Sequence, residues 1–212
     1  MRHIRERLLA ARLYLVCDER PDQFLEEALH GGVDVVQLRM KETSDEQLLA
    51  VGRRYRRLCD AHGALLMVND SPKVAACAEA DGVHLGQDDV SVEQARRVVG
   101  GERLIGLSTH SREQIEHASG VDYIGVGPVY PTPTKPGRKA VGLELVSYAA
   151  TKAGVPFFAI GGINAENVSA VAQAGASRIA VVRALTHSSD PQASARALRE
   201  AIGRRGELVG SA

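Results

Sequence analysis

The amino-acid sequence predicts an α/β protein of the (β/α)8 TIM barrel class. Short apolar runs bounded by Gly, Asp or Pro recur about eight times, and a longer, more polar stretch with helical spacing follows each run. About eight such units match the buried parallel strands of a closed barrel and the helices that cover them. The predicted strands lie near residues 13–17, 33–38, 64–68, 82–85, 103–107, 121–127, 156–160 and 178–182.

A doubly wound open sheet is the main alternative, because it has the same alternation of strands and helices. No glycine fingerprint of the GxGxxG kind follows the first apolar run, which weakens this alternative. We find no linker or shift in composition, so residues 1–212 are expected to form a single domain. A short N-terminal helix and a frayed C-terminal tail, 203–212, are expected at its ends.

Composition and charge restrict the class of partner. Lys plus Arg and Asp plus Glu each total 26, so no basic field favours a nucleic acid or a membrane, and any bound anion requires a local cluster. The three cysteines lack metal-ligand spacing, which indicates reduced thiols in the cytoplasm. A signal peptide is not expected, because Arg12 interrupts the N-terminal apolar run. The oligomeric state, including a homo-oligomer, stays open.

Typical capping residues mark both ends of two of the predicted helices. The stretch 44–63 begins with Ser44, a typical N-cap residue, and ends at Gly63. The stretch 164–176 is expected to run in the same way from a capping Asn164 to Gly175. The one long connection, 127–142, is rich in Pro and Gly, and loops of this length are commonly functional.

Polar residues gather where the predicted strands end, which is the face that carries the chemistry in TIM barrels. In "VVQLRMKE" (35–42), Gln37, Arg39 and Lys41 share one face, while Val36, Leu38 and Met40 are expected to face the helices. Further polar groups at strand ends are Asn69, Asp70, His84, Gln87, Asp88, Asp89, Ser108 and His110.

Asp70 and Asp89 follow adjacent predicted strands, so their carboxylates can converge on one cation. Magnesium (Mg²⁺) commonly takes one or two carboxylates together with phosphate oxygens and water. The alternative is that each Asp caps the helix that follows it. The nearby cations Arg39, Lys41 and Lys135 favour a site for Mg²⁺ and a polyphosphate, although a lone strand-end Lys is commonly just solvated.

Two further signals are weaker. The glycines of "AIGGINAEN" (159–167) let backbone N–H groups approach a phosphate, although Gly161 could instead serve a tight turn with positive φ. His84 and His110 are ambiguous, and each could be a packing residue at the barrel mouth, which is the commoner role of a lone His. No Ser/His/Asp or Cys/His arrangement and no P-loop is legible, so nucleophilic catalysis is not expected.

The motifs "VVQLRMK", "VNDSPKVAACAEADGVHLGQDD", "IGLSTHS", "YIGVGPVYPTPTK" and "AIGGI" resemble, in order, those of the thiamine-phosphate synthase family. The resemblance covers roughly Leu13 to Leu185. It implies a (β/α)8 barrel that joins 4-amino-5-hydroxymethyl-2-methylpyrimidine diphosphate to hydroxyethylthiazole phosphate, or its carboxylated form, and releases pyrophosphate. The implied partners are therefore small phosphorylated heterocycles.

The resemblance also implies roles for residues of this sequence. The implied Mg²⁺ ligands are Asp70 and Asp89. Contacts to the pyrimidine diphosphate fall on Gln37, Leu38, Arg39, Met40, Lys41, Asn69, Ser108 and Lys135, of which Arg39, Lys41, Ser108 and Lys135 are the implied catalytic groups. Contacts to the thiazole phosphate fall on Thr132, Pro133, Thr134, Gly162, Val182 and Arg183. Many relatives carry Ser where this sequence has Arg183.

Three rival functions share the fold. A thiazole tautomerase would bind thiazole phosphate without a metal and could use His110 as a base. The retained set Gln37, Arg39, Lys41, Asn69, Asp70 and Asp89 argues against it. A sugar-phosphate isomerase would turn over without metal, and a non-catalytic homologue would release no pyrophosphate.

Overall fold

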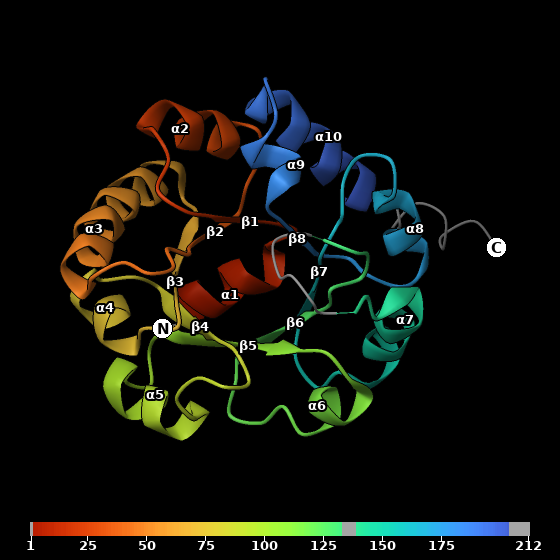
Figure 1. Cartoon of the computed structure of the whole chain (residues 1–212), viewed down its shortest axis with the longest axis horizontal. Coiled ribbons are helices and arrows are strands. Elements are labelled where there is room, and N and C mark those ends of the chain that lie inside the picture. Colours follow the sequence, from red (N-terminus) through yellow and green to blue (C-terminus); the bar gives the residue numbers. More distant parts are fainter. Residues whose placement is uncertain (1, 133–138, 204–212) are drawn as a thin grey trace.

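Eight parallel strands close into a barrel in a computed structural model that describes residues 2–132 and 139–203 (Figure 1). The first strand pairs with both the second and the eighth, which closes the sheet. The prediction of a single-domain (β/α)8 barrel is confirmed. The strands are Leu13–Cys17 (β1), Val35–Leu38 (β2), Leu65–Asn69 (β3), Gly82–Leu85 (β4), Leu104–Thr109 (β5), Tyr123–Val126 (β6), Phe157–Ile160 (β7) and Ile179–Val181 (β8).

Helices surround the strands and cover their outer faces (Figure 1). They are Asp22–His30 (α2), Asp45–His62 (α3), Pro72–Cys77 (α4), Val92–Val99 (α5), Arg112–Glu116 (α6), Gly142–Lys152 (α7), Val168–Gln173 (α8), Arg183–Thr186 (α9) and Pro191–Gly203 (α10). None of the helices within the described residues is long and apolar enough to cross a bilayer.

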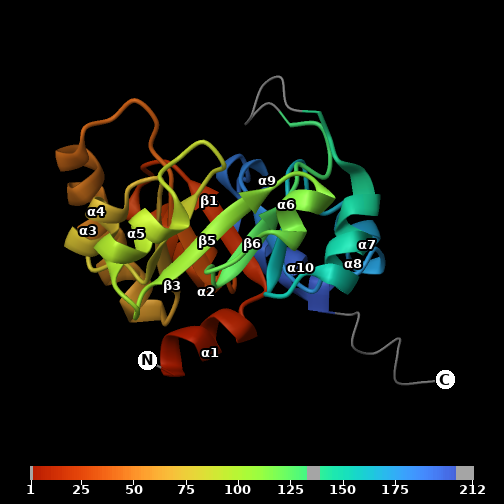
Figure 2. The same cartoon turned by 90° about the horizontal axis from the view of Figure 1, so that it is seen from below.

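The remaining helix, α1 (Arg2–Ala10), lies across the amino ends of the strands (Figure 2). Leu8 of this helix and Ala11 after it pack against the side chains inside the barrel. Arg5 anchors the helix through an ion pair with Asp122, in which Nε and Oδ1 are 2.9 Å apart. The helix therefore covers one end of the barrel, and the opposite end carries the carboxyl ends of the strands.

Alternation along the strands divides the core into two parts. On β1, Leu13, Leu15 and Cys17 pack toward the helices, while Tyr14 and Val16 point into the barrel. All five are buried, because both faces of the strand are covered. This explains why the sequence shows continuous apolar runs. The inner cluster consists of side chains from seven strands: Tyr14, Val16, Val35, Leu65, Met67, Leu104, Tyr123, Phe158 and Ala180.

Both predicted helices have their predicted capping residue, although the regular turns of the second begin later than expected. Ser44 caps α3 by accepting a hydrogen bond from the Gln47 backbone N–H (3.2 Å), and Gly63 ends it in the left-handed conformation. In the later helix, the Asn164 side chain accepts hydrogen bonds from the backbone N–H groups of Glu166 (2.9 Å) and Asn167 (3.2 Å), which is the pattern of an N-cap. The Asn164 carbonyl also accepts from the Val168 N–H (3.0 Å), and the regular helix α8 begins at Val168, after this capping turn.

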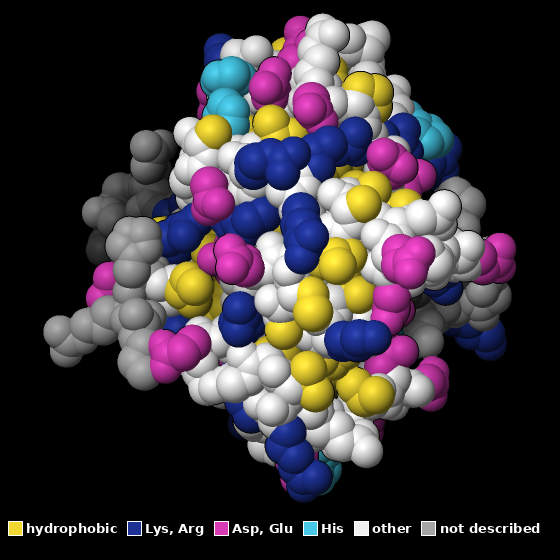
Figure 3. Space-filling view, turned by 90° about the vertical axis from the view of Figure 1, so that its left-hand side faces the viewer, with side chains coloured by type: hydrophobic (Ala, Val, Ile, Leu, Met, Phe, Trp, Pro, Cys, Tyr) yellow, Lys and Arg dark blue, Asp and Glu magenta, His cyan; other side chains and the backbone are white. Residues whose placement is uncertain are grey.

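Charged side chains on the outer surface are partly paired with one another. Figure 3 shows Lys and Arg among Asp and Glu on the side of the molecule that carries α3. Arg54 of α3 contacts Glu19 (3.1 Å) and Asp22 (3.4 Å), and Lys73 of α4 contacts Asp45 (3.5 Å). Such exposed pairs contribute little to stability.

Gly106 offers a test of the inner packing. It pairs with Tyr123 across β5 and β6, and a Cβ at this position would lie 2.1 Å from the Tyr123 ring. We expect Gly106→Ala to lower the free energy of unfolding by about 2 kcal/mol or more, measured by urea denaturation. In Gly101→Ala the added Cβ meets nothing within 4 Å. This control should change stability by less than about 0.5 kcal/mol, and equal losses would contradict the packing argument.

Candidate active site

A cavity of about 450 Å³ opens within the barrel among side chains from the carboxyl halves of the strands. Eight of the residues predicted from the sequence line it. They come from both halves of the chain: Gln37, Arg39, Asn69, Ser108, Thr132, Gly162, Val182 and Arg183. The structure therefore brings most of the predicted substrate contacts to one cavity.

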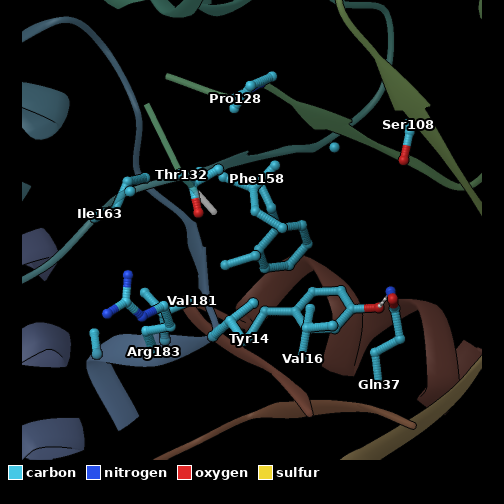
Figure 4. A pocket seen from close by; sticks show the side chains of 18 of the residues that line it. Tyr14, Val16, Gln37, Ser108, Pro128, Thr132, Phe158, Ile163, Val181 and Arg183 are labelled. Carbon is cyan, nitrogen blue, oxygen red and sulfur yellow. Dashed lines mark hydrogen bonds between the residues drawn. The ribbon is translucent and has the colours of Figure 1, made fainter. Parts of the chain in front are cut away.

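The lining residues fall on two sides of the cavity. Figure 4 shows Gln37 and Ser108 on one side and Thr132, Ile163 and Arg183 on the other. Both sides offer polar groups, and aromatic and aliphatic side chains lie between them. The shape suits an elongated ligand, or two ligands placed end to end.

Six predicted residues lie elsewhere or cannot be placed. The Leu38 side chain is fully buried between the strands and the helices, and Met40 packs against the same cluster. Contacts from these two residues to a ligand would have to come from the backbone. The predicted residues Pro133, Thr134 and Lys135 lie outside the described residues. Lys41 follows β2 and is exposed, outside the cavity lining.

A continuous row of hydrogen bonds crosses the cavity. Gln37 Nε2 donates to Tyr14 Oη (2.7 Å), and the hydroxyls of Tyr14 and Tyr123 are hydrogen-bonded (2.9 Å). Tyr123 Oη also contacts His84 Nδ1 (3.0 Å), while His84 Nε2 contacts Ser108 Oγ (3.0 Å). The buried polar groups thus satisfy one another.

Sequence reasoning missed the two tyrosines of this row. A signal was present, since each stands at an inward position of a strand and a buried Tyr hydroxyl usually requires a partner. Burial raises the pKa of both Tyr14 and Tyr123, so both hydroxyls stay protonated at neutral pH. They act here as neutral hydrogen-bonding groups.

Aromatic rings close the base of the cavity. The Tyr14 and Phe158 rings are nearly perpendicular with centroids 5.2 Å apart, and the Tyr123 and Phe158 centroids are 5.5 Å apart at a similar angle. Such edge-to-face contacts are favourable and hold the rings in place. Together the rings separate the cavity from the aliphatic part of the inner core, so a ligand rests on a mainly apolar floor.

The carboxylates of Asp70 and Asp89 meet at the ends of adjacent strands, as predicted. Burial raises the pKa of Asp70 to about 6, and the hydrogen bond and negative charge of Asp89 add to the rise. The charge of Arg39 and a hydrogen bond from Asn69 oppose it. Asp70 also has a positive φ of 63°, an uncommon conformation that Asp tolerates better than most residues.

The alternative role of these aspartates as helix caps is wrong. Ser71 caps α4 by accepting from the Val74 backbone N–H (3.3 Å), and Ser91 caps α5 by accepting from that of Gln94 (3.2 Å). The Asp89 carboxylate instead accepts a hydrogen bond from the Gly86 backbone N–H (2.6 Å). Because the Ser71 and Ser91 hydroxyls cap the two helices, both Asp carboxylates are available at the barrel mouth.

The donor set suits a hard cation that keeps other ligands. Within the described residues, no group of three or more His, Cys, Asp or Glu side chains is placed to hold a metal ion. Two carboxylates with Asn69 beside them match the arrangement in which Mg²⁺ takes its remaining oxygens from phosphate and water.

The two glycines after β7 form a tight turn beside the cavity. Gly161 and Gly162 have φ values of 105° and 66°, and a Cβ on Gly161 would lie 2.4 Å from Pro128. Gly161 therefore serves a tight turn against the segment after β6. Both glycines also line the cavity, on the side of Thr132 and Arg183.

Comparison with known proteins decides the family. The family model for thiamine monophosphate synthase matches residues 13–185. The chain belongs to the thiamine monophosphate synthase family.

Curated relatives and a solved structure support this membership. A thiamine-phosphate synthase of Saccharopolyspora erythraea is 49% identical over 94% of this chain and 96% of its own length. One from Nostoc punctiforme is 49% identical over 90% of this chain, which spans 56% of that longer protein. The thiamine phosphate pyrophosphorylase of Pyrococcus furiosus superposes with a TM-score of 0.85 at 31% identity, covering 95% of this chain and 98% of the other.

Membership in the thiamine monophosphate synthase family makes the chain an enzyme, a transferase of thiamine biosynthesis. The cavity at the carboxyl ends of its strands is the place where a TIM barrel carries its chemistry. The row of hydrogen bonds and the carboxylate pair lie at this end.

The Asp70–Asp89 pair predicts that the free energy of unfolding of this enzyme depends on pH. The measurement is made with a chelator present, so that no metal binds the pair. The folded pKa of Asp70, about 6, exceeds the ordinary value of 3.8, so its contribution to stability is present below pH 3.8 and lost as pH rises through 6. Asp70→Asn does not titrate and should gain stability relative to the wild type as pH rises from 4 to 8. The Asp70 residue as a whole is exposed even though its carboxylate is partly shielded, so solvent screening limits the gain to about 1 kcal/mol or less. A stability difference that stays constant with pH would contradict the raised pKa of Asp70.

Proposed function

We propose that the enzyme condenses 4-amino-5-hydroxymethyl-2-methylpyrimidine diphosphate with hydroxyethylthiazole phosphate, or its carboxylated form. The products are thiamine phosphate and pyrophosphate, and the reaction requires Mg²⁺. The observation that carries the proposal is one cavity with polar groups on two sides and a carboxylate pair at its mouth. Such a site can hold a diphosphate with its cation on one side and a phosphate on the other.

The diphosphate belongs on the side of β2 and β3. Arg39 lines the cavity and lies close enough to Asp70 to lower its pKa, so a cation and the carboxylate pair share this region. The planar guanidinium of Arg39 suits phosphate oxygens, and the exposed Lys41 adds a compact charge beyond the strand. Asp70 and Asp89 would hold Mg²⁺, and Lys135 is proposed to reach the diphosphate from the 127–142 connection.

The phosphate of the thiazole belongs on the opposite side. Thr132 and Gly162 line the cavity there, together with Val182 and the exposed Arg183. Arg183 brings a full positive charge to this side of the cavity. Backbone groups at Gly162 and Val182 and the Arg183 guanidinium would together neutralise the phosphate.

The chemistry is displacement of diphosphate from a carbon attached to an electron-rich ring. Mg²⁺ would supply electrostatic neutralisation of the leaving diphosphate. Arg39 and Lys41 would stabilise the same developing charge, and the aminopyrimidine ring carries the positive charge left behind. The thiazole nitrogen then attacks, so no protein nucleophile is required. The rings of Tyr14, Tyr123 and Phe158 would form an apolar wall beside the reacting groups.

Pyrophosphate release tests the reaction directly. With both heterocycles and Mg²⁺ present, we expect pyrophosphate and thiamine phosphate to form in equal amounts. Omission of either heterocycle, or addition of a chelator, should abolish release, because the leaving group is then neither displaced nor neutralised. Pyrophosphate release that does not depend on the metal, or that needs only one heterocycle, would contradict the proposal.

The carboxylate pair can be tested against its own neighbour. Asp89→Asn keeps an oxygen that can accept from the Gly86 N–H but loses the charge, so we expect kcat to fall by about 100-fold or more with little change in Tm. Asp88→Asn changes an exposed residue next to it and should alter kcat by less than about 2-fold. If both variants behave alike, or if Asp89→Asn loses Tm in proportion to its activity, the assigned role is wrong.

A further inference from the structure

Five side chains from five strands form one hydrogen-bonded row at the base of the cavity. Gln37 of β2 contacts Tyr14 of β1, which contacts Tyr123 of β6; Tyr123 contacts His84 of β4, which contacts Ser108 of β5. Each separation lies between 2.7 and 3.0 Å. Figure 4 shows the Gln37–Tyr14 end of this row and Ser108 across the cavity.

The chemistry of Gln37 gives the row a direction. An amide nitrogen donates hydrogen bonds and does not accept them, so Tyr14 Oη accepts from Gln37 Nε2. Either hydroxyl of the Tyr14–Tyr123 pair can donate. With Gln37 Nε2 facing Tyr14, we infer that the Tyr14 hydroxyl donates to Tyr123 and that Tyr123 donates to His84 Nδ1, because each hydrogen in the row then has an acceptor. A neutral imidazole that accepts at Nδ1 carries its hydrogen on Nε2, which then donates to Ser108 Oγ.

Reversal of the row requires a change at Gln37. A His84 protonated on Nδ1 would donate to Tyr123, and the hydrogen of Tyr14 would then need the Gln37 amide turned so that Oε1, rather than Nε2, faces it. Gln37, Tyr14, Tyr123 and His84 are all buried, so a mismatched donor or acceptor among them costs free energy. Burial also keeps both tyrosines protonated, as the direction requires.

We propose that His84 is a positioning residue, held as the Nε2–H tautomer by Gln37, Tyr14 and Tyr123, and that it makes Ser108 a hydrogen-bond donor to the ligand. Because Ser108 Oγ accepts from His84, its own O–H is left to point at an acceptor in the cavity. An unprotonated ring nitrogen of an aminopyrimidine is such an acceptor. The row therefore selects a heteroaromatic ring that presents a lone pair to Ser108, and this choice of ligand rests on the proposed function.

The tautomer can be measured on the free, full-length chain without any substrate. In long-range ¹H–¹⁵N spectra of the ¹⁵N-histidine-labelled protein, His84 should show a protonated Nε2 and an unprotonated Nδ1. The His84 signals are assigned by their loss in His84→Gln. If that variant does not fold, Ser108→Ala leaves the ring in place and should shift the same signals. A protonated Nδ1 would overturn the inference.

The row can also be broken at a distance from the ligand-facing group. Tyr123→Phe removes the hydroxyl that donates to His84, so we expect the single tautomer to give way to a mixture. Tyr148→Phe, on α7 and away from the cavity, serves as the control and should leave the His84 signals unchanged. A single Nε2–H tautomer that persists in Tyr123→Phe would show that the row does not set it.

A double-mutant cycle tests whether His84 acts through Ser108. With both heterocycles and Mg²⁺, His84→Gln should lower kcat/KM for the pyrimidine diphosphate by about 10-fold in the wild-type background. In the Ser108→Ala background the same change should cost less than about 2-fold, because the hydroxyl it positions is gone. Equal losses in both backgrounds would overturn the positioning role.

The two proposals can fail separately. If the wild-type chain releases no pyrophosphate but His84 is the Nε2–H tautomer, the proposed function fails and the direction of the row stands. If the chain releases pyrophosphate but His84 carries its hydrogen on Nδ1, the positioning role fails and the proposed function stands.

Discussion

The pairing of β1 with β8 is the interaction on which the site depends. Leu13 lies opposite Ile179, and this contact turns a row of parallel strands into a ring. Closure places the carboxyl ends of all eight strands around one mouth, so residues as distant in sequence as Gln37 and Arg183 line the same cavity. Without it, the polar groups at the strand ends would be spread along the edge of an open sheet.

The interior of the ring is divided along its length. Toward the amino ends, aliphatic side chains such as Leu65 and Leu104 fill the space, and α1 covers them. Toward the carboxyl ends the filling side chains are Tyr14, Tyr123 and Phe158, whose rings leave room above them. The tyrosines supply apolar bulk below and hydroxyls that the row of hydrogen bonds requires. One set of side chains thus completes the core and shapes the site.

Much of the fold and part of the site could be predicted because both follow from local pattern. The run at 13–17 became β1 with the same bounds, and the alternation after Val36 placed Gln37 inside the barrel and Leu38 outside. The convergence of Asp70 and Asp89 followed from strand order. Hydrogen bonds across the barrel could not be predicted from local pattern. No feature of the sequence near Tyr14 indicates that its hydroxyl bonds to that of Tyr123. The first regular turn of α8 begins at Val168, after the capping turn at Asn164, a boundary that helical spacing does not reveal.

The floor beneath the cavity sets how deep a ligand can sit. The rings of Tyr14 and Phe158 and the aliphatic side chains of the inner cluster fill the barrel toward its amino end, which α1 covers. The depth of the site is thus a property of core packing as much as of the residues that face the ligand.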